Sequence, residues 1–252
     1  MSDYDRNIAS RGFGAERAAV IDAGLRAYMI RVYNYMAAGV ALTGVVAWLT
    51  YNAAVITNAA GKITGLTPFG QAIFSGPLTI VLFLGTLGLV FFMSFRINRL
   101  QATTALALFM VYAGLLGLML SSVFLAYTGA SITRTFFISA ASFGALSLYG
   151  YTTQRDLSPV GSFLVMGLFG LILAMILNIF LKSTGLDFAI SAIGVLIFAG
   201  LTAWDTQRIK EMYDVHDDGT VAGRKAVMGA LSLYLDFINL FLFLLRFMGD
   251  RR

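Results

Sequence analysis

The sequence lacks cysteine entirely, and among its 252 residues it has one histidine and three prolines. Without cysteine the chain can form neither disulfide bonds nor the cysteine-ligated sites that hold structural zinc or iron–sulfur clusters. Charge is also scarce, because 12% of the residues are charged, whereas about a quarter are charged in a typical soluble domain. Since 58% of the residues are hydrophobic, we expect an integral membrane protein.

Familiar catalytic motifs are missing as well. The sequence has no HExxH zinc motif, no Walker loop and no GxSxG element. The single histidine, His216, lies in the polar segment DVHDDG, which argues against an intramembrane Ser–His hydrolase. An intramembrane aspartyl protease would carry the motifs YD and GxGD, which WDT and YLDFIN do not match. We therefore expect neither an enzyme nor a bound cofactor.

Apolar runs dominate the rest of the chain, and a run of roughly 20 apolar residues can cross a bilayer as a helix. They predict an all-α bundle of seven transmembrane helices over residues 31–252. The predicted spans are residues 32–50, 71–95, 103–127, 132–151, 160–181, 188–207 and 226–247. Proline is tolerated in the first turn of a helix, so Pro77 fits the start of the second span. Residues 1–30 have no apolar core and predict a cytosolic tail, with an interfacial helix near residues 16–28.

The cationic residues lie in the short segments between the apolar runs, as expected at a membrane surface rather than in a nucleic-acid-binding protein. With the N-terminus inside, the inner segments hold twelve of the 18 lysines and arginines. This bias predicts a multi-pass protein of the bacterial cytoplasmic membrane, with a cytosolic N-terminus and an outside C-terminus. The basic C-terminal end argues against that orientation, and a broken or re-entrant last helix would keep the C-terminus inside.

Two acidic residues, Asp205 and Asp236, lie well inside the last two predicted spans. Asp205 lies eight residues before Tyr213, and Asp236 lies ten residues after Ala226. If both helices extend to those points, the acids lie about 12–15 Å from the cytoplasmic ends, at 1.5 Å per residue. Equal depth on consecutive antiparallel helices makes contact between them plausible. An isolated acid there costs at least about 2.5 kcal/mol, so both side chains should face protein or water.

Two carboxyl groups in one poorly solvated site should share a proton, because like charges cannot easily both ionise there. Such a pair could sense pH. With both groups ionised, it would offer oxygen ligands to a hard cation such as Ca²⁺. The alternative is that each acid is hydrogen-bonded separately and serves only the structure.

Other polar residues lie near the predicted pair. Arg96 and Arg99 follow the second span and are candidate counter-charges that could latch the acids in an ion pair, Arg99 more than Arg96. Asn239 lies three residues after Asp236, hence on the same helix face, and is a supporting polar residue. We place Ser232 and Tyr234 on other faces.

The segments FAGLTAWDTQRI and LSLYLDFINLF, with FGALSLYGYTTQRDLSPVGSFLVMGLFGLI, resemble the Bax inhibitor-1 family, in its bacterial inner-membrane branch. The resemblance extends from Tyr28 to the end of the chain. It implies a seven-helix bundle with the C-terminal helix at its centre, and a pH-sensitive calcium leak gated by Asp205 and Asp236. It also implies Arg99 as the latch. Some members carry a glutamate in the second helix, which residues 71–95 lack.

Three functional hypotheses follow. The leading one is a proton-regulated cation leak, with calcium and protons as its ligands in the lipid bilayer. The second is an interaction protein that restrains a membrane protease or another partner, since the resemblance also links bacterial relatives to a membrane AAA protease. The third is a proton-coupled transporter that uses the same two acids.

Overall fold

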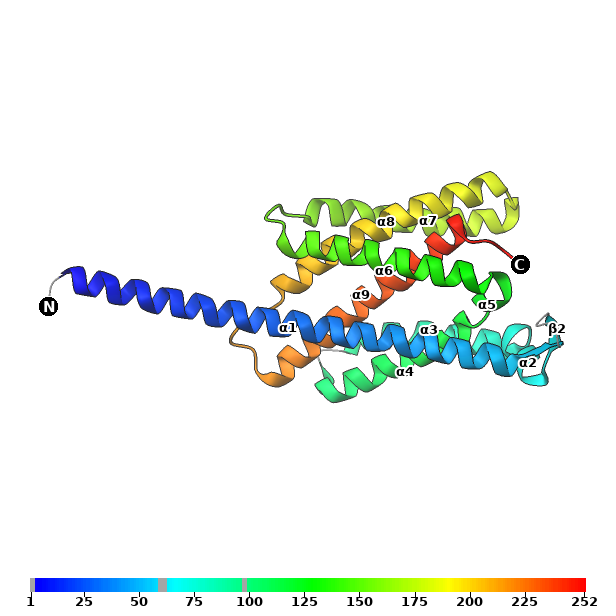
Figure 1. Cartoon of the computed structure of the whole chain (residues 1–252), viewed down its shortest axis with the longest axis horizontal. Helices are drawn as coiled ribbons and strands as arrows, with labels where there is room; N and C mark the ends of the chain where they lie inside the picture. The colour runs from blue at the N-terminus through cyan, green and yellow to red at the C-terminus, as the bar shows by residue number, and fades with distance from the viewer. Residues whose placement is uncertain (1–2, 59–62, 97–98) are drawn as a thin grey trace.

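The computed structural model describes residues 3–58, 63–96 and 99–252. These residues form a helical bundle with one small β-hairpin (Figure 1). The elements in chain order are α1 (Asp3–Ala54), β1 (Val55–Thr57), β2 (Ile63–Leu66), α2 (Pro68–Phe74), α3 (Pro77–Arg96), α4 (Ala102–Leu120), α5 (Val123–Ala126), α6 (Gly129–Thr152), α7 (Ser158–Leu181), α8 (Thr184–Glu211) and α9 (Gly219–Met248). The chain is thus an all-α membrane protein, apart from the antiparallel pair of β1 and β2.

Six helical segments in the described part of the chain are long and apolar enough to cross a membrane. They are Asp22–Ala54, Pro77–Arg96, Ala102–Ala126, Ser158–Leu181, Thr184–Glu211 and Gly219–Met248. The fourth predicted span corresponds to α6, which has 24 residues but is rich in serine and threonine. Length and composition therefore support six of the seven predicted spans, and the exception is the span that corresponds to α6.

Four small polar residues of α6 lie on one side of that helix, at positions 131, 135, 139 and 147. Ser131, Thr135, Ser139 and Ser147 are all buried, and α6 packs against α8 and α9. Small polar residues let transmembrane helices approach closely. At Gly150 the approach reaches the backbone, because a Cβ atom there would lie 2.1 Å from the carbonyl oxygen of Ala203. The serine and threonine residues that make α6 less apolar are therefore on the face that packs against other helices.

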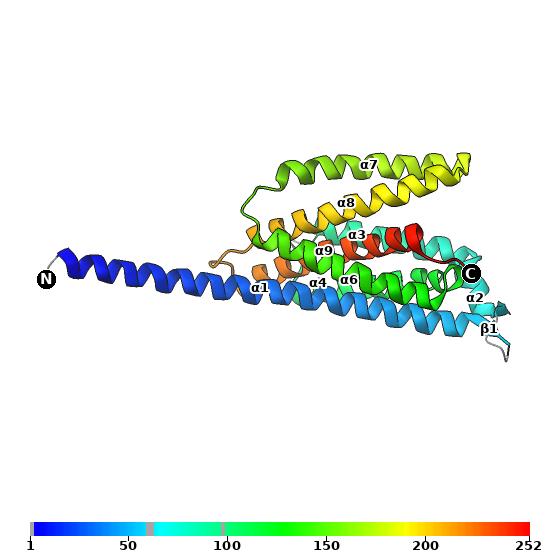
Figure 2. The ribbon, with the colours of Figure 1, turned by 45° about the horizontal axis from the view of Figure 1, so that its top comes forward.

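Helix α9 is at the centre of the bundle and packs against α1, α4, α6 and α8. In its most apolar 18-residue window 67% of the residues are buried, whereas the corresponding value for α7 is 6%. Figure 2 shows α7 at the edge, beside α8. The large side chains of α7 are largely exposed, as expected for a surface that faces lipid. The resemblance implied this central place for the C-terminal helix.

Several boundaries differ from the prediction. Helix α1 is continuous from Asp3 to Ala54, and its N-terminal part extends past the bundle (Figure 1). The predicted second span is divided into α2 and α3, with Pro77 starting α3. Proline clashes with the carbonyl group four residues earlier, which for Pro77 is that of Ile73, so α2 ends at Phe74. The Ile73 carbonyl instead accepts a hydrogen bond from the Thr79 hydroxyl at 2.5 Å. The predicted third span is likewise interrupted, between α4 and α5.

Candidate functional site

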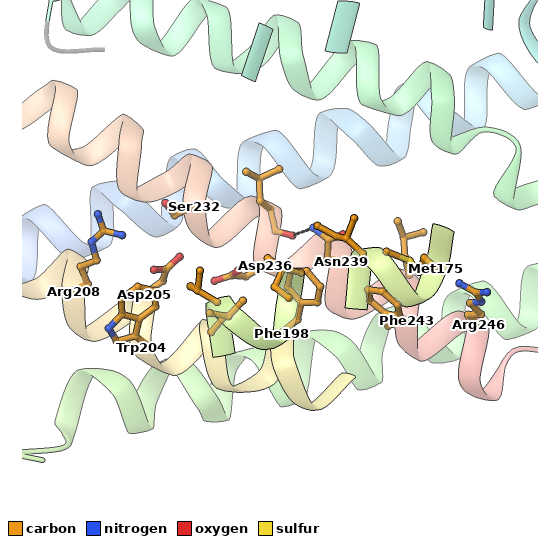
Figure 3. Close-up of a pocket in the computed structure, with 16 residues that line it drawn as sticks. Met175, Phe198, Trp204, Asp205, Arg208, Ser232, Asp236, Asn239, Phe243 and Arg246 are labelled. Atoms are coloured by element: carbon orange, nitrogen blue, oxygen red, sulfur yellow. Dashed lines mark hydrogen bonds between the residues drawn. The ribbon is translucent and has the colours of Figure 1, made fainter. Parts of the chain in front are cut away.

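The structure brings Asp205 of α8 and Asp236 of α9 together. Asp236 is 5% exposed, and Asp205 is partly buried. Both residues line one cavity of about 690 Å³ between α7, α8 and α9, and their carboxyl groups lie within reach of a side-chain hydrogen bond. Figure 3 shows both carboxyl groups turned into this shared space. The two acids therefore have the common depth and the contact that consecutive antiparallel helices allow.

The contact between the two acids depends on a proton. Ionised carboxylates only accept hydrogen bonds, so a bond between Asp205 and Asp236 requires one protonated carboxyl group. Without that proton, Asp236 Oδ2 is buried and has no donor among the described residues. A buried polar atom without a partner is costly, at about 1–3 kcal/mol and more for a charged group. The pair is thus arranged to hold a proton or a cation.

Two further polar side chains of α9 line the cavity, Asn239 and Ser232. Asn239 donates from Nδ2 to the Leu235 carbonyl at 2.8 Å, so its Oδ1 atom is the part available to a ligand. Asn239 thus lies beside Asp236, as its spacing predicts. The expectation that Ser232 lies on another face is wrong, because a residue four positions earlier shares the face of Asp236.

The cation beside the pair is Arg208, three residues after Asp205 in α8. Its charge acts directly on Asp205, and its guanidinium lies 5.6 Å from the ring centroid of Trp204. Arg96 and Arg99 are both exposed and do not line the cavity. The structure therefore does not bring the predicted latch, Arg99, to the two acids. A loop between α3 and α4 carries Arg99, whereas Arg208 is fixed on the same helix as Asp205.

The other end of the cavity reaches Arg246, near the end of α9. Arg246 forms an ion pair with Asp187, in the first turn of α8. Arg251 Nη2 lies 3.8 Å from Asp187 Oδ2. The wall between the two ends is apolar on the α7 side, where Val165, Leu168, Ile172 and Met175 line it. The cavity thus has a cation at each end and the two acids between them.

Four residues of this cavity carry side-chain oxygen atoms that could contact a hard cation. Calcium takes six to eight oxygen ligands, whereas the cavity offers the carboxylates of Asp205 and Asp236, the amide of Asn239 and the hydroxyl of Ser232. In the described part of the chain no three His, Cys, Asp or Glu side chains form a metal cluster.

Sequence reasoning missed three residues of this cavity. Arg208 and Ser232 lie three and four positions from the acids, and helical spacing alone would have placed them beside Asp205 and Asp236. The ion pair of Arg246 with Asp187 had no comparable signal. Its partners are 59 residues apart and meet only because α8 and α9 are antiparallel neighbours.

Comparison with known proteins agrees with this architecture. A family model described as "Inhibitor of apoptosis-promoting Bax1" matches residues 25–252. The chain is 48% identical to the protein RP147 of Rickettsia prowazekii, over 100% of both chains. It is 43% identical to a protein of Caulobacter vibrioides, again over 100% of both chains.

A third relative carries a descriptive name. The chain is 45% identical to the inner membrane protein YbhL of Escherichia coli over 233 residues, which cover 91% of this chain and 94% of that relative. The family match covers most of the chain and includes every helix that lines the cavity. This chain is therefore a membrane protein of the Bax inhibitor-1 family.

Proposed function

We propose that this protein is a pH-sensitive cation leak of the bacterial inner membrane, with calcium as the main transported ion. The single observation that carries the proposal is the contact of Asp205 and Asp236 inside a cavity of about 690 Å³. Ionisable groups at membrane depth are costly and mark ion or proton pathways. The inner-membrane location is supported by the name of the YbhL relative.

In this mechanism a proton and a cation compete for the two acids. When the pair shares a proton, the negative charge of the cavity falls and a cation gains little there. When both carboxyl groups ionise, their repulsion is relieved by a bound cation, and a divalent ion balances both charges. Deprotonation therefore loads the site, and protonation empties it.

Two cations line the same cavity as the acids, Arg208 on α8 and Arg246 on α9, and the lining of α7 is uncharged. Arg208 is close enough to Asp205 to compete with a passing cation. We assign Arg208 the latching role that the resemblance implied for Arg99. Movement of Arg208 away from Asp205 would expose Asp205 to the cytoplasmic side.

We further propose seven crossings, with α6 as the seventh and with the N-terminus in the cytosol. The buried polar stripe of α6 supports this count, because it leaves the apolar residues of that helix to face lipid. The two chain ends lie at opposite ends of the bundle (Figure 1), and α9 is a single unbroken helix. Both features support an odd number of crossings and an outside C-terminus.

The test is calcium flux into proteoliposomes between about pH 6 and 8, a range that shifted carboxyl groups reach. We compare the wild type with Asp205→Asn and Asp236→Asn. Wild-type flux should change with pH, and both variants should lose that dependence. The matched control is Asp156→Asn, an exposed acid in the link before α7 that lies outside the cavity. Its pH profile should overlay the wild type.

Flux that keeps its pH dependence in the Asp205→Asn/Asp236→Asn double variant would contradict the mechanism. Saturable uptake of an organic substrate, coupled to protons, would instead assign the same acids to a transporter. Arg208→Gln tests the latch, since an open latch should raise flux at fixed pH. Arg99→Gln serves as its control, because Arg99 does not line the cavity.

A second candidate function is a modulator that binds a membrane protease or another membrane protein. The observation that favours it is the N-terminal part of α1, which extends past the bundle as a continuous helix (Figure 1). Deleting residues 2–21 should then abolish co-purification of the partner and leave calcium flux unchanged. Folded wild-type protein that passes no calcium at any pH would make this function the better one.

A further inference from the structure

A second cavity, of about 650 Å³, lies at the end of the bundle away from Arg208, beyond the ion pair of Arg246. The turn between α7 and α8, the first turn of α8, and the segment after α9 surround it. Its charged and hydroxyl-bearing lining comprises Tyr127, Lys182, Ser183, Thr184, Asp187, Arg246 and Arg251. Three cations and one acid give this cavity a net charge of +2.

The excess positive charge is not satisfied within the protein. Asp187 is shared by Arg246 and Arg251. Lys182 has no side-chain partner in the described residues. The cavity also contains the N-terminal residues of the 28-residue helix α8, and the positive end of a helix dipole favours an anion.

Exposed apolar side chains lie directly beside the cations. Phe180 and Leu181, which precede Lys182, are 78% and 59% exposed. Phe188 of α8 and Phe247 of α9 pack together, with ring centroids 5.1 Å apart, and are 60% and 43% exposed. Spans α7 and α9 end here and span α8 begins here, which is where the hydrocarbon core of a membrane would meet the polar headgroups. A soluble anion would contact only the cationic side chains, whereas a lipid would contact both these and the exposed apolar side chains beside them.

We propose that this cavity binds the phosphate headgroup of an anionic phospholipid, with its acyl chains along the exposed apolar side chains of α7 and α8. Lys182 and Arg251 are the cations that recognise the phosphate, and Arg246 is held back by Asp187. This site is separate from the pair of Asp205 and Asp236, so it does not depend on the ion leak.

The sequence offers variants that remove charge without harming the fold. Lys182 has a left-handed backbone, with φ of 49°, which asparagine adopts more readily than lysine does. Lys182→Asn therefore removes the charge and keeps the left-handed backbone conformation at this position. Arg251 lies near the chain end with its side chain 65% exposed, so Arg251→Gln should be equally harmless. The control is Arg96→Gln with Arg155→Gln, which removes two exposed cations from the opposite end of the bundle.

The experiment is native mass spectrometry of the purified full chain with phosphatidylglycerol or phosphatidylethanolamine of the same acyl chains. The wild type and the control should retain phosphatidylglycerol in preference to phosphatidylethanolamine. The Lys182→Asn/Arg251→Gln variant should bind phosphatidylglycerol roughly tenfold to thirtyfold more weakly, since each surface cation contributes about 1 kcal/mol. Gel filtration of each variant confirms that it is folded.

Two outcomes would overturn the proposal. Equal retention of phosphatidylglycerol by the double variant and the control would mean that these cations form no site. Displacement of the lipid by an equal concentration of glycerol phosphate or inorganic phosphate would assign the cavity to a soluble anion instead. Preference for phosphatidylglycerol that is lost only in the double variant, and that resists soluble phosphate, would support it.

Discussion

Asp187 and Arg246 form an ion pair at the far end of the cavity that contains Asp205 and Asp236. Asp187 and Asp205 are on the same helix, about 27 Å apart along its axis at 1.5 Å per residue. Arg208, whose charge acts on Asp205, therefore lies at one end of the cavity, and the ion pair of Arg246 with Asp187 lies at the other.

The first prediction concerns this far ion pair. Asp187→Asn leaves Arg246 without its counter-charge. The loss matters because both side chains of the pair are only about 30% exposed. We expect the free energy of unfolding to fall by about 1–2 kcal/mol, a value between those for exposed and fully buried ion pairs. The apparent Tm in detergent should fall with it. Asp250→Asn is the control, because its ion pair with Arg134 has side chains 54% and 70% exposed. Equal Tm values for the two variants would show that the Asp187 pair contributes nothing special.

The second prediction concerns a hydrogen-bonded connection between α1, α4 and α9. Thr43 Oγ1 donates to the Ala113 carbonyl at 2.9 Å, so the Tyr234 hydroxyl, 2.7 Å from Oγ1, must donate to it. Thr43→Val leaves the fully buried Tyr234 hydroxyl without a partner, which costs about 1–3 kcal/mol. Tyr234→Phe removes the hydroxyl itself and should cost less, about 1 kcal/mol. Thermal unfolding of both variants checks this order, and the reverse order would refute the assigned donor.

The third prediction concerns the close approach of α6 to α8. Gly150→Ala places a Cβ atom 2.1 Å from the carbonyl oxygen of Ala203, a backbone atom that cannot turn away. Overpacking of this kind costs about 1–3 kcal/mol. Gly144→Ala, on the same helix, meets no atom within 4 Å and should be neutral or stabilising, because alanine favours a helix. Similar unfolding temperatures for the two variants would mean that α6 can shift away from α8.

The fourth prediction separates the link between α8 and α9 from the pH response of the cavity. Asp214 accepts hydrogen bonds from the backbone amide of His216 and from its ring Nδ1, at 2.9 and 3.0 Å. These bonds lower the pKa of Asp214. Because the folded-state pKa is lowered, ionised Asp214 stabilises the folded state above the pKa of the unfolded state. That stabilisation is lost only as the pH falls through the folded-state pKa. Asp214 therefore stays ionised between pH 6 and 8, and Asp214→Asn should leave the pH dependence of calcium flux unchanged.

The single histidine supplies the companion control. Histidine is the residue type that ordinarily changes charge between pH 5 and 8, and His216 lies in the same exposed link. If the acids of the cavity are the sensor, His216→Asn should retain the wild-type flux profile in proteoliposomes. A flattened profile in this variant would move the sensor from the cavity to the link.

Much of the candidate site could be predicted from the sequence because depth in a membrane follows from counting residues. Asp205 and Asp236 are at similar distances from the ends of consecutive apolar runs, and antiparallel helices bring such residues level. The existence of the long helices is equally local, because it follows from long uninterrupted apolar runs. The breaks at Pro77 and near Ser121 lay within such runs, where hydropathy alone gives no warning.

Helix rotation and the partners across each interface could not be predicted. A span that is apolar on every side has no periodicity to show which face meets protein, so the sequence could not show whether Arg99, which follows another helix, reaches the acids. Packing decided this, because α8 carries Arg208 on the face of Asp205, while Arg99 stays exposed in a loop. The sequence by itself determined that the chain enters a membrane and how deep its two acids lie. Only the tertiary structure decided which charges face them, since that depends on the rotation of each helix about its axis.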